Sequence, residues 1–325
     1  MGKYRIVVTD DRHGSYEVEN EVFKEIGASV EVHNLGDEEE TVEVLREADA
    51  VLVNLHPMPG RVIRELRKCR VISRYGVGYD NVDVDAASQA GIWVARVPDF
   101  CLEDVSDHAL ALLLSCVRHT ALRDRRIRRG EWKQIGEYPS YRIVGRTLGL
   151  IGFGTIARAL FRKVSGLGLA RVLVFDPYVE RREIEAAGAA AVGLRELLRE
   201  SDYVSVHAPL SPETRGLIGA RELGLMKPSA ILVNTARGPL VDEKALAEAL
   251  KRRKLAAAAL DVFAAEPLPA DSPLRDLENV VLTDHCGWYS EESMVELKSK
   301  TARNALEVLK GGRPLYAVNN PQLDG

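Results

Sequence analysis

The apolar residues of this 325-residue chain fall into short β-branched runs separated by stretches with helical spacing, and this alternation constrains the fold most. The first hundred residues carry runs such as RIVVTD, AVLVN and RVISRYG, and the alternation begins again at Gly145 with TLGLIG. Near-continuous apolar strands between helices are typical of parallel sheets that helices cover on both faces. The sequence therefore predicts two successive Rossmann-like or flavodoxin-like, doubly wound α/β domains.

Length and composition agree with this prediction. At roughly 100–200 residues per domain the chain has room for two domains, and its 46% hydrophobic and 28% charged residues are typical of globular proteins rather than disordered ones. A net charge of −4 gives the chain no general attraction to nucleic acid or to anionic membranes. The longest apolar run falls well short of the roughly 20 residues that a membrane-spanning helix needs. The four scattered cysteines show no CxxC spacing, and no secretory signal is recognisable, so we expect a reduced, cytoplasmic protein without a metal site.

A glycine-rich turn identifies the second domain as the nucleotide-binding one. Gly152, Gly154 and Ala157 follow an apolar strand in GxGxxA spacing and open a helix-compatible run. The first glycine permits a tight turn, the second lets the main chain approach a pyrophosphate, and the small alanine lets helix and strand pack closely. The next strand, RVLVFD, ends in Asp176, whose carboxylate can hold a ribose 2′-hydroxyl and would repel a 2′-phosphate. This pattern predicts NAD as the cofactor rather than NADP.

Three reactive side chains follow the later strands of this second region. Arg237 comes after the run AILVN, Glu266 after AAAALDVF, and His285 after VVLTD. Ligands of open α/β sheets bind outside the carboxyl ends of the strands, so these side chains are predicted to share one edge of the sheet. Taken singly, each has an ordinary structural explanation, and it is their convergence beside a dinucleotide turn that points to a catalytic site.

The three residue types suit hydride transfer to a 2-keto acid. A guanidinium can bind a carboxylate and the adjacent carbonyl oxygen through paired hydrogen bonds, which suits Arg237. An imidazole can protonate that carbonyl oxygen as the hydride arrives, which suits His285. A carboxylate on the other ring nitrogen orients the imidazole and favours its protonated form, which suits Glu266.

With these motifs in view, the chain resembles the D-isomer-specific 2-hydroxyacid dehydrogenase family over nearly its full length. The matching stretches are YGVGYDNVD from Tyr75, GLIGFGTIA, HAPLSPETRGLI, MKPSAILVNTARGPLVDEKAL, ALDVFAAEP and the His285 region. The resemblance implies that Arg237, Glu266 and His285 form the catalytic set. It implies that Thr155, Ile156, His207, Thr235 and Asp261 lie near the cofactor, with Asp261 on the nicotinamide side. It also implies that Tyr75, Gly76, Val77 and Gly78 form a turn whose main-chain N–H groups bind the substrate carboxylate.

The resemblance further implies a discontinuous domain arrangement. Residues 1–100 with 288–325 would form the substrate domain, and residues 101–287 the NAD-binding domain with the long helix that begins near Glu103. The catalytic site would then lie in a cleft between the domains. Members of the family are typically homodimers built around that helix, so we expect a homodimer that acts on a small-molecule 2-keto or 2-hydroxy acid.

Within the family, the stretches VPDFCLEDVSDHALALLL and GWYSEESMVEL are most similar to the C-terminal-binding-protein branch. That branch includes transcriptional co-repressors that bind NAD, so an NAD-sensing regulator with little turnover is the alternative interpretation. A phosphoglycerate dehydrogenase is disfavoured because we identify no basic phosphate cradle and no appended regulatory domain. Asp284 departs from the family, which usually has proline before the catalytic histidine, and its carboxylate could either reposition His285 or raise the His285 pKa further.

Three further features have open interpretations. Trp288 either forms a wall of the substrate pocket, where its ring would favour 2-keto acids with apolar side chains, or is an ordinary packing aromatic. His56 either lines the substrate site or caps a loop. The run of arginines in 123–129 is more consistent with a solvated helix face than with a nucleic-acid patch, because no aromatic residue is interleaved with it.

Overall fold

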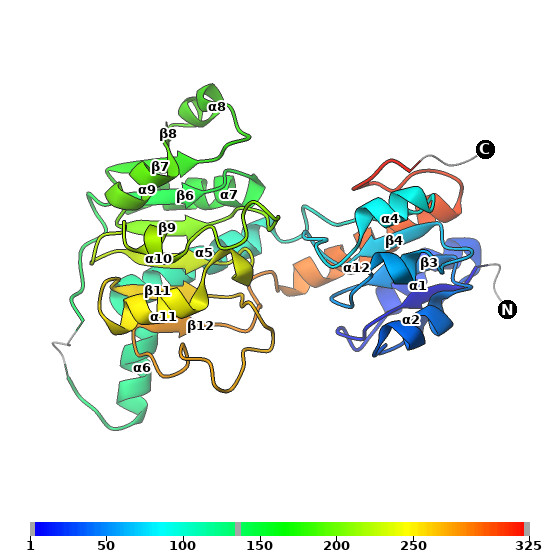
Figure 1. Cartoon of the computed structure of the whole chain (residues 1–325), viewed down its shortest axis with the longest axis horizontal. Coiled ribbons are helices and arrows are strands. Elements are labelled where there is room, and N and C mark those ends of the chain that lie inside the picture. The colour runs from blue at the N-terminus through cyan, green and yellow to red at the C-terminus, as the bar shows by residue number, and fades with distance from the viewer. Residues whose placement is uncertain (1–3, 134–137, 322–325) are drawn as a thin grey trace. The chain divides into compact units, whose positions relative to one another are not determined.

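The computed structural model describes residues 4–133 and 138–321. The chain forms two compact units (Figure 1), the first comprising residues 1–101 and 290–325 and the second residues 102–289. The first unit is therefore discontinuous in sequence. Its ends come together where Ala95 pairs with Ala317 in an isolated β-bridge.

The first unit is built on a five-stranded sheet in which every strand pair is parallel, in the order β2-β1-β3-β4-β5. Its strands are β1 (Ile6–Val8), β2 (Val30–Val32), β3 (Ala50–Val53), β4 (Val71–Arg74) and β5 (Trp93–Ala95). Its helices are α1 (Glu17–Phe23), the 3-10 turn η1 (Lys24–Ile26), α2 (Glu38–Leu45), α3 (Gly60–Ile63), α4 (Val84–Gln89) and α12 (Glu291–Leu309).

Helices cover both faces of this sheet. One face packs alternate strand residues such as Val7, Val51 and Ile72 against apolar side chains of α2, α3 and α4. On the other side, α12 packs against α1, β3 and β4. Helix α12 begins at a capping box in which the Ser290 hydroxyl accepts the main-chain N–H of Ser293, as suits an N-terminus whose first N–H groups lack helical partners.

The second unit is built on a seven-stranded parallel sheet in the order β12-β11-β10-β9-β6-β7-β8. Its strands are β6 (Thr147–Ile151), β7 (Arg171–Phe175), β8 (Ala190–Ala191), β9 (Tyr203–Val206), β10 (Ile231–Asn234), β11 (Ala257–Leu260) and β12 (Val280–Leu282). Its helices are α5 (Leu102–Arg118), α6 (Thr120–Arg128), α7 (Thr155–Lys163), η2 (Val164–Leu167), α8 (Arg181–Ala186), α9 (Leu194–Glu200), α10 (Ala220–Leu223), η3 (Gly238–Leu240) and α11 (Glu243–Lys251).

The two faces of this sheet carry separate hydrophobic cores. Val204 and Val206 face a core that includes leucines of α9, α10 and α11. Tyr203 and Val233 face the other core, which includes side chains of α5, α7 and α8. This alternation along single strands confirms the predicted doubly wound α/β architecture, because each strand is buried on both faces.

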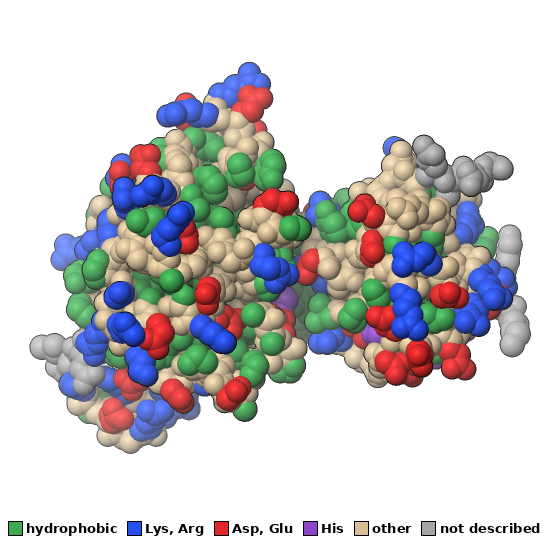
Figure 2. Space-filling view, viewed as in Figure 1, with side chains coloured by type: hydrophobic (Ala, Val, Ile, Leu, Met, Phe, Trp, Pro, Cys, Tyr) green, Lys and Arg blue, Asp and Glu red, His purple; other side chains and the backbone are tan. Residues whose placement is uncertain are grey.

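The surface is charged and mixed. Lys and Arg side chains are interspersed with Asp and Glu over the face drawn in Figure 2. Most of the arginine run 123–129 lies on α6, where Arg126 pairs with Glu278 at 2.7 Å and Arg128 with Asp124 at 2.8 Å. None of the helices within residues 4–133 and 138–321 combines the length and the apolar character that a bilayer crossing requires.

Candidate active site

The Arg237 loop follows β10 and is held by the last residue of that strand. Asn234 is fully buried, and its side chain accepts the N–H of Ala236 at 3.0 Å and donates to the carbonyl of Arg237 at 2.9 Å. A Cβ added to Gly238 would lie 1.9 Å from the carbonyl carbon of Phe263. Only glycine therefore lets the loop after β10 approach the loop after β11 this closely.

Glu266 connects that second loop to His285. One oxygen, Oε1, accepts the N–H of Phe263 at 2.9 Å, and the other, Oε2, lies 2.7 Å from Nδ1 of His285. Burial favours a raised pKa for Glu266, but the bonds from His285 and Phe263 and the positive charge of Arg237 outweigh it and hold the pKa below the ordinary value. The structure thus brings Arg237, Glu266 and His285 together at the carboxyl ends of β10, β11 and β12, with Glu266 ionised at neutral pH.

Asp261 anchors the segment that carries His285. Its carboxylate is 3% exposed. It accepts the main-chain N–H groups of Cys286 at 3.1 Å and Gly287 at 3.0 Å, and the hydroxyl of Thr283 at 2.6 Å. These contacts flank His285, whose φ of 58° lies in the left-handed region that residues other than glycine seldom adopt. Asp261 was predicted to contact the nicotinamide, and in the structure its oxygens are committed to this loop.

His108, which the sequence analysis did not single out, completes the anchor. Nε2 of His108, on α5, lies 3.0 Å from Oγ1 of Thr283 and 3.2 Å from Oδ1 of Asp261. Because the Thr283 proton is directed to Asp261, the ring nitrogen of His108 must be the donor in these contacts. Burial favours a raised pKa for Asp261, but the bonds from His108, Thr283 and Gly287 lower it, so the anchor is anionic at neutral pH.

Asp284 and Trp288 lie beside His285 in sequence. Asp284 is exposed, and within residues 4–133 and 138–321 no hydrogen bond joins it to His285. Burial, together with the carboxylates of Asp261 and Asp284, raises the pKa of the Cys286 thiol to about 11, so this cysteine is protonated at neutral pH. The ring of Trp288 stacks edge-on against Tyr289, with centroids 5.8 Å apart. This contact agrees with a packing role and leaves the predicted substrate role of Trp288 untested.

The glycine-rich turn has the geometry that a dinucleotide requires. Gly152 has a φ of 91°, and a Cβ on it would lie 2.9 Å from the main chain of His207 and Ala208. A Cβ on Gly154 would meet nothing within 4 Å, so the main chain there is open to a ligand. Gly154 caps α7, whose first residue, Thr155, is exposed, while Ile156 behind it is partly buried. The N–H groups and dipole of this helix suit a pyrophosphate.

Three polar residues border the same end of the sheet. Asp176 follows β7, and its carboxylate accepts the N–H of Phe153 at 2.8 Å, which ties it to the glycine turn. His207 follows β9 and contacts the Ser205 hydroxyl at 2.9 Å; burial lowers its pKa to about 4, so it is neutral at pH 7. The Thr235 hydroxyl, after β10, is buried without a partner in the part of the chain that the structure describes. A donor or acceptor of this kind fits a site that a polar cofactor completes.

In the first unit, the predicted carboxylate-binding turn follows β4. The N–H of Gly76 bonds to the carbonyl of Arg74 at 3.0 Å, and the carbonyl of Gly76 accepts from Val97 at 2.9 Å. Among residues 4–133 and 138–321, no hydrogen bond uses the N–H of Val77 or Gly78. The side chain of Tyr75 is 2% exposed and points into the unit. Val77 and Gly78 are therefore the members of the predicted turn that still have free N–H donors.

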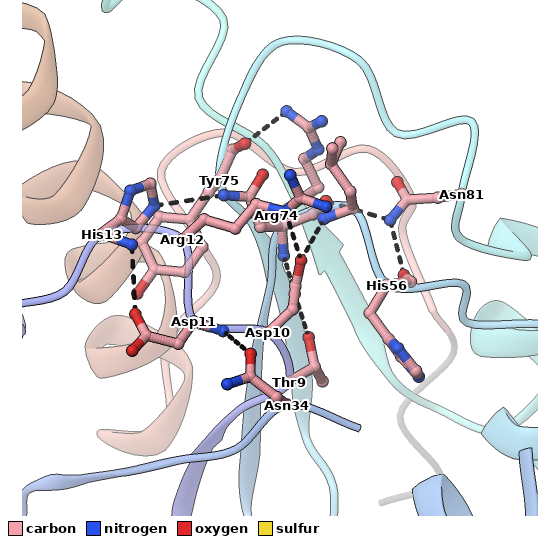
Figure 3. A network of polar contacts seen from close by, with 12 residues as sticks. Thr9, Asp10, Asp11, Arg12, His13, Asn34, His56, Arg74, Tyr75 and Asn81 are labelled. Carbon is pink, nitrogen blue, oxygen red and sulfur yellow. Dashed lines mark hydrogen bonds and ion pairs between the residues drawn. The ribbon is translucent and has the colours of Figure 1, made fainter. Parts of the chain in front are cut away.

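The loop after β3 lies beside this turn and is held from two sides (Figure 3). Asp10 accepts the N–H of Asn54 at 3.0 Å and that of Leu55 at 2.8 Å, and Asn81 donates to the carbonyl of His56 at 2.9 Å. The imidazole of His56 is 8% exposed and contacts the Thr41 hydroxyl at 2.8 Å, which favours its loop-capping interpretation. Sequence reasoning missed Asp10. This residue directly follows the apolar run RIVVT, so it stands at the end of a predicted strand just as the catalytic candidates do.

Comparison with known proteins agrees with this geometry. Residues 110–287 match the family model described as "D-isomer specific 2-hydroxyacid dehydrogenase, NAD binding domain". The chain is 41% identical over 284 residues to a glyoxylate reductase of Korarchaeum cryptofilum, a match that covers 86% of this chain and 85% of that protein. It is 38% identical to a D-3-phosphoglycerate dehydrogenase of Methanocaldococcus jannaschii, over 98% of this chain but only 60% of that protein. Among solved structures, the D-lactate dehydrogenase of Aquifex aeolicus, complexed with NAD and lactic acid, superposes with a TM-score of 0.86 at 26% identity, covering 98% of this chain and 100% of that one.

Proposed function

Because the chain belongs to the D-isomer-specific 2-hydroxyacid dehydrogenases, which are NAD-dependent oxidoreductases, we propose that it reduces a small 2-keto acid to the D-2-hydroxy acid. The observation that carries the proposal is the 2.7 Å contact between Glu266 and His285 next to the charge of Arg237. In this arrangement the side chain of Arg237 binds the substrate, and the pair of Glu266 and His285 donates or accepts the proton.

Each residue has a distinct role in the proposed reaction. Arg237 of the second unit binds the substrate carboxylate and polarises the carbonyl. In the first unit, the N–H groups of Val77 and Gly78 are the proposed donors to a substrate carboxylate. Bound NADH supplies the hydride to the carbonyl carbon. His285 donates the proton at Nε2 to the developing alkoxide. Its Nδ1–H group stays hydrogen-bonded to Glu266, whose negative charge stabilises the imidazolium. Asp261 holds the His285 segment in register.

The cofactor site is proposed to use residues of the second unit. Gly152 and Gly154 give the pyrophosphate access to the N-terminus of α7, where Thr155 and Ile156 begin the helix. Asp176 is proposed to bind the adenosine ribose. The residues proposed to line the remaining cofactor site are His207, Thr235 and Asp261.

The comparisons favour a short substrate. A glyoxylate reductase is among the most similar relatives, so glyoxylate and hydroxypyruvate are the first candidates. Because the chain is also similar to phosphoglycerate dehydrogenases, 3-phosphohydroxypyruvate is the alternative substrate to compare with these two. If Trp288 walls the pocket, which is one of its two interpretations, Trp288→Ala changes the preference between large and small 2-keto acids.

The test follows NADH absorbance at 340 nm against a panel of 2-keto acids that contains all three compounds and pyruvate. We expect turnover of at least one, and loss of that turnover in Arg237→Ala because the carboxylate anchor is gone. Arg275→Ala is a matched control, since this arginine bonds the carbonyls of Leu268 and Pro269 and lies outside the proposed site. Folded wild-type protein that binds NADH but reduces none of the panel contradicts the proposal and favours the alternative of an NAD-sensing regulator similar to the C-terminal-binding proteins.

We further propose that the protein is a cytoplasmic homodimer. Ile127 and Trp132 are 52% and 81% exposed, and they line a cavity of about 200 Å³ beside α6. Most of the other residues that line this cavity are charged or polar, and exposed apolar side chains with a polar surround suit an interface. Light scattering after size-exclusion chromatography is expected to give twice the chain mass of 35.9 kDa, and a monomer at micromolar concentration contradicts the dimer.

A further inference from the structure

A buried polar cluster lies next to the proposed carboxylate-binding turn, and the proposed reaction uses none of its side chains. We call it the Tyr75 cluster; its members are Glu19, Tyr75 and Lys298. Their exposed fractions are 0%, 2% and 6%. Charged side chains are almost never buried to this extent unless they are paired. The cluster therefore requires an explanation beyond the packing of the unit.

The hydrogen bond between the first two members has a definite direction. Tyr75 donates its phenol proton to Oε1 of Glu19 at 2.9 Å. Burial, reinforced by the charge of Glu19, raises the pKa of Tyr75 far above its ordinary value, so the phenol keeps its proton and is the donor. Burial also raises the pKa of Glu19, while the Tyr75 bond and the charge of Lys298 act against this rise.

Lys298 and the loop before α1 enclose the pair. Nζ of Lys298 donates to the carbonyl of Ser15 at 2.6 Å and lies 5.8 Å from the ring centroid of Tyr16. The ring of His13 meets that of Tyr75 edge-on, with centroids 5.0 Å apart, as Figure 3 shows from close by. Residues from α1, the end of β4 and the loop after β1 thus meet at the side chain of Tyr75, and Lys298 of α12 bonds that loop.

Tyr75 is also the residue from which the turn departs. Its N–H bonds to the carbonyl of Val53 at 2.8 Å, and its carbonyl accepts from the guanidinium of Arg74. The next residue, Gly76, has a φ of 139°, which is open only to glycine. With the phenol also fixed, Tyr75 is held at its main chain and at the far end of its side chain, so the direction of the following N–H groups is set.

We propose that Tyr75 and Glu19 are positioning residues, whose buried hydrogen bond aims the N–H groups of Val77 and Gly78 at the substrate carboxylate, with Lys298 as the compensating charge. The inference rests on the proposed function. It differs from a general structural role in one respect: it affects substrate binding through the first unit and leaves the cofactor site and the proton-transfer residues of the second unit unchanged.

The test separates substrate binding from the other steps. Tyr75→Phe keeps the ring but removes the hydroxyl, and it is expected to raise KM for the active 2-keto acid about tenfold, the equivalent of about 1.4 kcal/mol. The value of kcat should stay within about twofold and the NADH dissociation constant should be unchanged. The matched control is Tyr4→Phe, because Tyr4 also donates a phenol proton in the first unit, at 3.1 Å to the carbonyl of Leu309. That control should leave all three quantities unchanged.

Two variants of Glu19 identify the partner. Glu19→Gln keeps an oxygen that can accept the Tyr75 proton, so its KM should remain within about threefold of wild type. Glu19→Ala should match Tyr75→Phe, and the double variant should be no worse than either single one, because both remove the same hydrogen bond. A folded Tyr75→Phe with wild-type KM, or additive effects in the double variant, overturns the inference while wild-type activity upholds the proposed function. Wild-type protein that reduces no 2-keto acid overturns both.

Discussion

The contact between Glu266 and His285 leads to a quantitative prediction for Glu266→Gln. The carboxylate uses one oxygen for the N–H of Phe263 and the other for Nδ1 of His285. Glutamine has a single acceptor oxygen, so if that oxygen stays on Phe263, its NH₂ group faces Nδ1. The imidazolium then has no acceptor for its Nδ1 proton, and the form of His285 that donates the proton is disfavoured.

The size of the effect follows from the geometry. A hydrogen bond between charged partners contributes about 1.5–3 kcal/mol. The two side chains are 30% and 28% exposed, so water partly screens the pair, and we take the lower half of this range. At 1.36 kcal/mol per factor of ten, the lower half of this range predicts that kcat for reduction falls about 10- to 45-fold. KM for the 2-keto acid should change little, because Arg237 and the first-unit turn are intact.

The assay is steady-state NADH oxidation by wild type, Glu266→Gln and Glu243→Gln. Glu243 is the matched control because its carboxylate also accepts a main-chain N–H of the same loop, that of Ala264 at 2.5 Å, but within residues 4–133 and 138–321 it bonds to neither Glu266 nor His285. Glu243→Gln should leave kcat within about twofold. If Glu266→Gln has wild-type kcat, or if both variants lose activity equally, the proposed role of the pair is wrong.

Three further changes test other parts of the account. Asp261→Asn places an amide against N–H donors of the His285 segment, so urea titration should show a loss of about 2–3 kcal/mol in the free energy of unfolding; an unchanged midpoint contradicts the anchor. Asp176→Ser removes the charge that opposes a 2′-phosphate, and the ratio of kcat/KM for NADH to that for NADPH should fall about tenfold or more; an unaltered ratio argues against this ribose contact. The lowered pKa of His207, about 4, means that the unfolded chain alone takes up its proton between pH 6.5 and 4, so the stability it contributes is complete above pH 6.5 and is lost as the pH falls through this window. Between pH 7 and 5, the free energy of unfolding of His207→Asn should therefore fall by about 2 kcal/mol less than that of wild type in urea titrations. Equal falls in the two proteins refute this.

Much of the fold could be predicted because its strands are apolar on both faces. The run AVLVN became β3 and AILVN became β10, each with four buried residues. Strand β8, only Ala190–Ala191 at the edge of its sheet, was missed because two alanines carry no strand signal. Helix α6 was visible only as a charged run, since it presents little apolar surface and is tied instead by contacts such as that of Arg126 with Glu278.

The expectation that ligands bind at the carboxyl ends of the strands was sufficient to group the catalytic candidates, because these ends share one edge of a parallel sheet. It could not predict which direction a side chain takes after the strand ends. Tyr75 was expected at the substrate through its turn, yet its ring is buried and bonded to Glu19. Likewise, the contacts of Asp261 with His108 and Gly287 join residues far apart in sequence, and only the folded chain reveals them.

The most direct test of the central claim is the fate of the hydride. With NADH that carries deuterium at both C4 positions and hydroxypyruvate or another active 2-keto acid as substrate, mass spectrometry and chiral analysis of the product are decisive. We predict a D-2-hydroxy acid with one deuterium on C2. A product without deuterium, an L product, or no product from folded protein that binds NADH contradicts the account.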